Sequence, residues 1–327
     1  MMKAMVYNKY GTTNVLNLKE IEIPALKQNE VLVKIHAVSV NSWDWDLLRG
    51  RPFLSRLGGL FKPKYKILGA DIAGRVEAIG RDVSHISVGD EVFGDLSWCG
   101  WGGFAEYVNV HEQALSLKPP SMTFEEAAAI PQAGVLALQG LRDRGQIQKA
   151  KKVLINGAGG GVGTFALQIA KMYGAEVTCV DSEKKLDTLK SIGADHVIDY
   201  NEEDFTKKGQ YYDMILDVVG NRSIFDYKRV LNPNGTYVMI GGSMSLILQL
   251  LLLGPMINKN ESKKMAILAH KPNKDDQDLL KELFMTGKLV PVIDRRYSLS
   301  QVPEAIRYLG EGHAKGKLVV CVVNSEN

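Results

Sequence analysis

One segment constrains the fold more than any other: an expected strand that is followed by a run of glycines and then by an expected helix. The strand is expected over residues 151–157 and the helix over residues 164–171. Between them lies the sequence Ala158-Gly159-Gly160-Gly161-Val162-Gly163, called here the glycine turn. Glycines let backbone approach a pyrophosphate, and the free N–H groups of a helix's first turn favour its negative charge. The order strand, turn, helix and second strand predicts a dinucleotide site, with a tight packing turn as the alternative.

From about Ser121 the chain alternates apolar strands with helical stretches. Ser121–Glu126 resembles a helix start, because a polar cap is followed by acidic residues and then by alanines. This alternation predicts a doubly wound parallel sheet with helices on both faces. The expected strands are 153–155, 177–180, 197–198, 214–216 and 237–240, and the expected helices include 162–173 and 183–191.

The residues before and after this region have a different texture. Residues 31–38, 74–79 and 105–110 read as short strands cut by turns, which is typical of a barrel-like β unit. The tail returns to short strands at 296–299 and 317–323. We therefore expect one discontinuous domain, residues 1–120 plus 290–327, around an inserted nucleotide-binding domain of residues 121–289.

Composition excludes several classes of protein. The net charge is +3 and no dense Lys/Arg block is present, which argues against a nucleic-acid partner. The three cysteines lie far apart, which fits neither a disulfide framework nor a zinc ribbon. Together with an N-terminus that lacks a signal-peptide pattern, they predict a reducing, cytoplasmic location.

The most apolar run is Leu246–Leu253. It is too short for a membrane span, which needs about 20 residues. We expect a buried helix or a subunit-contact surface there, with a pocket lid or a membrane-touching patch as the alternative.

The second strand of the inserted domain ends at Asp181. An acidic residue there usually accepts hydrogen bonds from ribose hydroxyls, which favours NAD. Ser182, Lys184 and Lys185 follow at once and offer partners for a 2′-phosphate. Repulsion of ~1–4 kcal/mol at about 4 Å does not decide between the two coenzymes. On the residues alone, both remain open.

The glycine turn followed by Gln168–Lys171 resembles the zinc-free quinone oxidoreductase (zeta-crystallin-like) branch of the medium-chain dehydrogenase/reductase superfamily. The resemblance covers nearly the whole chain, and its supporting pieces are Val88–Val92, Gly102–Tyr107, Gly193–Tyr200 and Gly312–Lys317. It implies a Rossmann domain inserted in a GroES-like β-barrel domain, with a cleft between them. A homodimer is also implied.

The resemblance bears on zinc as well. Zinc-dependent relatives use two cysteines and a histidine at positions that correspond here to Asn41, Ala70 and Ala133. None of these is a thiolate or an imidazole, whereas a catalytic zinc needs three good protein ligands. We expect no metal site, and therefore reduction of an activated double bond or a quinone in preference to oxidation of simple alcohols.

Catalytic candidates follow from the same resemblance. Asn41 would donate to a substrate carbonyl and Asp44 would anchor backbone or cofactor; turn and cap hydrogen bonding is the alternative for both. Trp45 would contribute to an apolar, aromatic-rich substrate site, or else to the core. Two positions depart from the pattern, because Asp46 and Leu136 stand where relatives often carry tyrosine and threonine.

On the cofactor side, Ser182, Lys185 and Tyr200 look like the trio that relatives place around the adenosine phosphate of NADPH. This favours NADP(H), with NAD(H) as the alternative. Gly241 and Gly242 would lie by the nicotinamide. Lys317 would reach the cofactor phosphates or would be an exposed lysine at a strand end.

The expected activity is NAD(P)H-dependent reduction of quinones or α,β-unsaturated carbonyls by hydride transfer. Its substrate would be a small apolar carbonyl compound or quinone. Three alternatives stay open: an NADP-binding protein without turnover, an enoyl-thioester reductase and an alcohol dehydrogenase.

Overall fold

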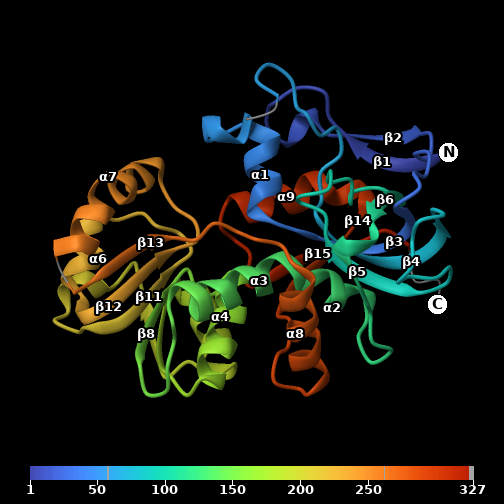
Figure 1. Cartoon of the computed structure of the whole chain (residues 1–327). Coiled ribbons are helices and arrows are strands. Elements are labelled where there is room, and N and C mark those ends of the chain that lie inside the picture. The colour runs from blue at the N-terminus through green and yellow to red at the C-terminus, as the bar shows by residue number, and fades with distance from the viewer. Residues whose placement is uncertain (57–58, 261, 324–327) are drawn as a thin grey trace. The chain divides into compact units, whose positions relative to one another are not determined.

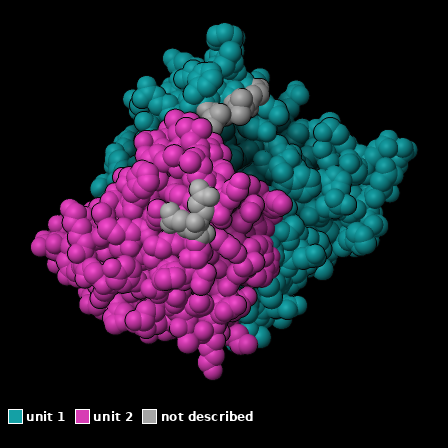
Figure 2. Space-filling view, turned by 60° about the vertical axis from the view of Figure 1, so that its left-hand side comes forward, with its two compact units in different colours: residues 1–133, 272–287, 293–327 teal, residues 134–271, 288–292 magenta. Residues whose placement is uncertain are grey.

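The computed structural model describes residues 1–56, 59–260 and 262–323. The chain divides into two compact units, which Figure 2 draws in separate colours. The first unit comprises residues 1–133, 272–287 and 293–327, and the second unit comprises residues 134–271 and 288–292. Each is described by itself below.

The second unit contains a six-stranded sheet in which every neighbouring pair is parallel. Its order is β10-β9-β8-β11-β12-β13. This confirms the predicted doubly wound parallel sheet, and the edge strand β13 adds one strand to those expected. The strands are β8 (Lys152–Asn156), β9 (Glu176–Asp181), β10 (His196–Asp199), β11 (Tyr212–Asp217), β12 (Leu231–Met239) and β13 (Lys264–Ile267).

Helices α4 (Gly161–Met172) and α5 (Glu183–Ser191) lie in the predicted places. The other helical segments are α3 (Pro131–Gln139), the π-helical turn η4 (Gly140–Arg144), the 3-10 turn η5 (Phe205–Lys207), α6 (Ile224–Arg229) and α7 (Met244–Asn260). The strand order runs one way from β8 to β10 and the other way from β11 to β13. Because parallel crossovers are right-handed, α4 and α5 cover one face and α6 and α7 the other. The order reverses between β8 and β11, where open α/β sheets bind ligands.

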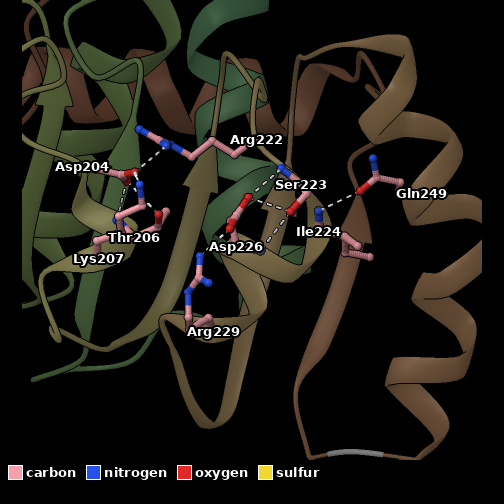
Figure 3. Close-up of polar contacts among 9 residues, drawn as sticks. All are labelled: Asp204, Thr206, Lys207, Arg222, Ser223, Ile224, Asp226, Arg229 and Gln249. Carbon is pink, nitrogen blue, oxygen red and sulfur yellow. Dashed lines mark hydrogen bonds and ion pairs between the residues drawn. The ribbon is translucent and has the colours of Figure 1, made fainter.

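Polar contacts fix the start of α6 against α7 (Figure 3). The Ser223 hydroxyl donates to Asp226 at 2.6 Å, and the backbone N–H of Ile224 donates to Gln249 Oε1 at 2.9 Å. Arg222 pairs with Asp204 at 3.0 Å, which ties the loop before α6 to the loop after β10. The bond from Ile224 satisfies one of the backbone N–H groups that a helix start leaves without a partner.

The predicted apolar run lies within α7. Leu246 and Leu250 are buried, whereas Leu251 and Leu252 are 61% and 71% exposed. The helix is therefore only half covered, by α6 and β13, in the part of the chain that the structure describes. None of the described helices is long and apolar enough to cross a membrane.

The first unit is built on a larger sheet of order β14-β15-β3-β4-β5-β7, with β6 also paired to β3. Apart from the parallel pair β14–β15, its neighbours are antiparallel. The strands are β3 (Glu30–Val40), β4 (Asp71–Ile79), β5 (Glu91–Asp95), β6 (Tyr107–His111), β7 (Leu115–Leu117), β14 (Ile293–Ser298) and β15 (Lys317–Cys321); β1 (Met2–Val6) and β2 (Asn17–Ile21) form a separate hairpin. The tail strands β14 and β15 thus belong to the first unit.

Helices α1 (Ser42–Arg49), α2 (Phe124–Ala129) and α9 (Val302–Gly310) complete this unit, with the turns η1 (Thr13–Val15), η2 (Phe53–Arg56), η3 (Glu112–Ala114) and η6 (Leu299–Gln301). Helix α2 begins where expected, since Thr123 N donates to Glu126 Oε2 at 2.9 Å and Glu126 N donates to Thr123 Oγ1 at 3.2 Å. Helix α1 packs on α9, and α2 packs on β3, β4 and β15 (Figure 1).

Two segments differ from the expected boundaries at residues 120 and 290. Residues 121–133 and helix α8 (Lys274–Met285) belong to the first unit. The reason for α8 is its contact with β5 and β7: Gln277 Nε2 donates to the carbonyl oxygen of Phe93 at 3.0 Å, and Lys274 Nζ donates to that of Leu115 at 3.1 Å. Local sequence carries no signal for such distant pairing.

Candidate functional site

The glycine turn leaves the carboxyl end of β8 at the point where the strand order reverses. The N–H groups of Gly157 and Ala158 donate to the carbonyl oxygen of Val180 at 3.0 and 3.2 Å. Gly157 has φ +82°, a conformation that favours glycine. Gly160 caps α4, which starts at Gly161. The first N–H groups of α4 have no acceptor within the helix, and they lie at the positive end of the helix dipole.

The glycines of this turn serve two different purposes. A Cβ on Gly163 would lie 2.5 Å from the backbone C and Cα of Ala158, so this glycine allows the helix to press against the turn. A Cβ on Gly160 would meet nothing nearer than 3.7 Å. Gly160 therefore leaves open space, which is what a pyrophosphate requires.

The carboxylate of Asp181 closes onto the glycine turn. Its Oδ2 accepts from Gly159 N at 2.8 Å, and its Oδ1 accepts from Ser182 N at 2.9 Å and lies 3.2 Å from Lys185 Nζ. A Cβ on Gly159 would lie 2.6 Å from the side chain of Lys185. The structure thus brings the acidic residue and one of the two candidate lysines together over the turn.

Tyr200 lies beside the backbone of Asp181. It follows β10, whose Asp199 pairs in register with Asp181, and its N–H donates to the Asp181 carbonyl oxygen at 3.2 Å. Its ring is about half exposed. Ser182, which caps α5, Lys185 and Tyr200 therefore gather at the ends of β9 and β10.

The Gly241-Gly242 pair follows β12 and lies against the loop that follows β11. A Cβ on Gly241 would lie 2.7 Å from the Val218 carbonyl oxygen, and one on Gly242 would lie 2.7 Å from that of Gly220. The close approach of these two backbone segments requires glycine at both positions.

Asp217 is a buried residue at this edge that sequence reasoning missed. It ends β11 and accepts from Asn156 Nδ2 at 2.9 Å, Gly220 N at 2.8 Å and the Tyr237 hydroxyl at 2.7 Å. It thereby joins the ends of β8, β11 and β12. Its place at the end of an apolar strand, like that of Asp181, was the available signal.

In the first unit, Asp44 is an anchor for backbone. Its Oδ2 accepts from Asn41 N at 2.8 Å and its Oδ1 accepts from Gly69 N at 2.9 Å, and the side chain is fully buried. Both carboxylate oxygens thus accept hydrogen bonds from backbone N–H groups, which is the backbone-anchoring role considered for Asp44 above. Burial raises the pKa of Asp44 to about 7, against the lowering effect of these two hydrogen bonds.

Asn41 lies in a buried polar cluster with Asp71 and Lys317. Lys317 Nζ donates to Asn41 Oδ1 at 2.6 Å, and Asn41 Nδ2 donates to Asp71 Oδ2 at 3.0 Å. Lys317 Nζ also lies 3.7 Å from Asp71 Oδ2. Burial raises the pKa of Asp71 to about 6, an effect that Lys317 opposes, and burial lowers the pKa of Lys317.

The structure also places two further candidate residues, Lys317 and Trp45. Lys317 is only 2% exposed and donates to Asn41 within the first unit, so it is not the exposed strand-end lysine of the alternative. Trp45 is a packing residue on α1: Arg49 lies over its ring at 4.6 Å, and a Cβ on Gly310 of α9 would lie 2.6 Å from ring atom Cε3. In both cases tertiary contacts across the unit decide the orientation.

The residues at the positions corresponding to zinc ligands do not fit a zinc ion. Ala70 and Ala133 have no donor atom, and the Asn41 amide is bonded to Lys317 and Asp71. Among the described residues, no three His, Cys, Asp or Glu side chains are grouped so as to hold a metal.

Comparison with known proteins gives two family matches. Residues 27–120 match the alcohol dehydrogenase GroES-like domain, and residues 192–320 match the family described as zinc-binding dehydrogenase. The first match accounts for the β-rich sheet of the first unit and confirms its expected GroES-like class.

Relatives and solved structures cover nearly the whole chain. The chloroplastic quinone-oxidoreductase QR1 of Triphysaria versicolor is 34% identical over 98% of each chain. The chloroplastic NADPH-dependent alkenal/one oxidoreductase of Arabidopsis thaliana is 32% identical over 98% of this chain and 79% of its own length. The solved quinone oxidoreductase from Coxiella burnetii superposes with a TM-score of 0.88 at 30% identity, covering 98% of this chain and 99% of its own.

Proposed function

The chain belongs to the quinone oxidoreductase-like branch of the medium-chain dehydrogenase/reductase superfamily, and we propose that it reduces quinones or α,β-unsaturated carbonyls with NAD(P)H and without zinc. The second unit would bind the nucleotide and the first unit would supply the substrate-side groups. The observation that carries the proposal is the glycine turn at the sheet's switch point, which presents open backbone and the N-terminus of α4.

The chemistry divides simply between cofactor and protein. A bound reduced nicotinamide supplies the hydride. The chain's own residues then need to polarise the carbonyl, exclude water and let a proton reach the product. Asn41 is our candidate for polarisation, because a neutral amide N–H can donate to a carbonyl oxygen. Asp44 would act behind it by fixing the start of α1. Geometry of binding would supply most of the rate.

We propose NADP(H) as the preferred coenzyme. Lys185, Ser182 and Tyr200 lie together beyond the turn and suit a 2′-phosphate, provided that Lys185 exchanges its pairing with Asp181 for the phosphate. Ala158–Gly163, with Gly241 and Gly242, would line the rest of the nucleotide site.

Two further proposals concern assembly and location. The half-exposed apolar face of α7 beside the edge strand β13 supports a homodimer, because exposed apolar surface and open strand edges favour association. The three free cysteines support a reducing compartment such as the cytoplasm. Light scattering and localisation of a tagged chain test these two proposals.

The decisive assay follows NADPH and NADH oxidation against a panel of quinones, enones, enoyl thioesters and alcohols, with and without a chelator. We expect quinone or enone turnover that the chelator leaves unchanged. Chelator-sensitive alcohol oxidation would contradict the zinc-free proposal. NADPH binding without turnover on any acceptor would favour a binding protein, and thioester-specific turnover would favour an enoyl reductase.

A further inference from the structure

The orientation of the Asn41 side-chain amide is decided by the chemistry of its two partners. An ammonium group only donates and an ionised carboxylate only accepts. Asn41 Oδ1 must therefore face Lys317, at 2.6 Å, and Nδ2 must face Asp71, at 3.0 Å. The flipped amide would oppose donor to donor and acceptor to acceptor.

The partners themselves are fixed by the sheet. Asp71 begins β4 and lies opposite Ser39 of β3, whose hydroxyl donates to Asp71 Oδ2 at 3.2 Å. The backbone N–H of Gln132 donates to the same carboxylate at 3.2 Å. Lys317 begins β15, which pairs with β3 on the other side. Three neighbouring strands thus converge on one amide.

One of the two side-chain N–H groups of Asn41 has no acceptor among the described residues. Asn41 Nδ2 has two hydrogens, and within the described residues it has one acceptor, Asp71. The side chain is 6% exposed, so the group is nearly dry but not sealed. A hydrogen bond from a fixed donor in such a nearly dry place contributes more free energy than the same bond in water.

We propose that Lys317 and Asp71 are positioning residues that fix the Asn41 amide so that its second N–H is available to polarise the substrate carbonyl. The inference rests on the proposed role of Asn41. It also explains why a lysine is buried here: the positive charge of Lys317 compensates Asp71 and, at longer range, Asp44 and Asp95.

Removing the ammonium has a specific consequence. Asp71, buried without its cation, would take up a proton at higher pH. A protonated carboxyl can donate as well as accept, so it would no longer select one orientation of the amide. The amide would then populate both flips, and the second N–H would be lost in part of the molecules.

The test compares Lys317→Met, Lys317→Gln and the matched control Lys118→Met. Lys118 is another buried lysine of the first unit, where it pairs with Glu91 at 2.9 Å and donates to the Met122 carbonyl oxygen at 2.6 Å. Each variant is studied in the full chain, with the fold checked by circular dichroism. Lys317→Gln keeps an N–H donor and serves if Lys317→Met fails to fold.

The first readout does not need activity. Asparagine-selective 15N labelling reports the Asn41 side-chain amide, which is identified by its loss in Asn41→Ala. In Lys317→Met we expect its chemical shift to change and its hydrogens to exchange faster. Lys118→Met should leave both unchanged. An Asn41 signal indifferent to Lys317→Met overturns the inference.

The second readout is kinetic. We expect kcat with the best acceptor to fall about 10–100-fold in Lys317→Met, less in Lys317→Gln and not at all in Lys118→Met. The acid limb of kcat/KM should move to higher pH in Lys317→Met only. Unchanged kcat and pH profile in a folded Lys317→Met contradict the positioning role. A wild-type chain that turns over no acceptor contradicts the proposed function instead, and the inference with it.

Discussion

The backbone N–H of Gly159 donates a 2.8 Å hydrogen bond to Oδ2 of Asp181, so the carboxylate that ends β9 is tied to the glycine turn itself. The other oxygen pairs with Lys185 at 3.2 Å. The negative charge that would repel a 2′-phosphate is therefore compensated by the cation that would bind one. Under our proposal, the preference between NADP(H) and NAD(H) depends on whether Lys185 keeps its pairing with Asp181 or exchanges it for the 2′-phosphate.

Replacing Lys185 with alanine should weaken NADPH binding about 10–100-fold and leave NADH binding nearly unchanged, because only the 2′-phosphate loses a charge-assisted hydrogen bond. Calorimetric titration with each coenzyme measures both affinities. Lys184→Ala removes the exposed neighbouring lysine and is the control. Equal losses for NADPH and NADH in Lys185→Ala would show that this lysine does not select the phosphate.

Two alanine substitutions in the glycine turn should separate folding from binding. Gly163→Ala places a methyl 2.5 Å from Ala158 backbone and should cost roughly 1–3 kcal/mol of unfolding free energy. Gly160 has φ −87° and open space around its Cα, so Gly160→Ala should fold normally. Its NADPH affinity should nevertheless fall at least about tenfold, because the methyl occupies space that the pyrophosphate needs. Full affinity in Gly160→Ala would place the phosphates elsewhere.

The contact between α1 and α9 gives a stability prediction. Gly310→Ala would drive a methyl into the Trp45 ring, 2.6 Å from Cε3, and should destabilise the first unit by roughly 1–3 kcal/mol. Gly254→Ala in α7, whose nearest new contact would be 3.7 Å, should be neutral or stabilising by up to about 1 kcal/mol. Denaturant unfolding followed by tryptophan fluorescence compares the two. Equal stability of both variants would rule out the tight Trp45 packing.

Because the Asp44 carboxyl is buried, we expect the free energy of unfolding to depend on pH. Burial raises its pKa from 3.8 to about 7, so the folded chain binds a proton that the unfolded chain releases between these values. The stabilising contribution of this carboxyl is therefore present at acid pH and is lost as pH rises from about 4 to 7.

Asp44→Asn removes that dependence and turns an amide N–H toward a backbone donor. We expect it to destabilise the chain more at pH 5 than at pH 8, by at least about 1 kcal/mol, since one pKa unit corresponds to about 1.4 kcal/mol. Urea unfolding at the two pH values measures the difference. Asp187→Asn, at a fully exposed side chain, is the control. A cost that grows with pH would contradict the burial of a neutral Asp44.

Much of the second unit could be predicted because its determinants are local. Apolar strands of 153–155 and 214–216 and the glycine turn each carry their own pattern, and the structure places strands and turn there. The Thr123–Glu126 capping box is equally local, and it starts α2 as expected.

What could not be predicted depends on pairing across the chain. Lys317 has the sequence of a surface lysine at a strand end, and only the approach of β15 to β3 buries it beside Asn41. Trp45 turns toward Gly310, more than 200 residues away in the sequence. Helix α8 joins the first unit through Gln277 and Phe93. An amphipathic sequence pattern can indicate that such side chains are buried, but it does not identify the distant element that buries them.

The most direct test of the account is a calorimetric titration of metal-free, chelator-treated protein with NADPH. We predict binding of one nucleotide per chain, with affinity reduced in Gly160→Ala and with turnover once a quinone or enone is added. Failure to bind either NADPH or NADH, or binding that returns only when zinc is restored, would contradict it.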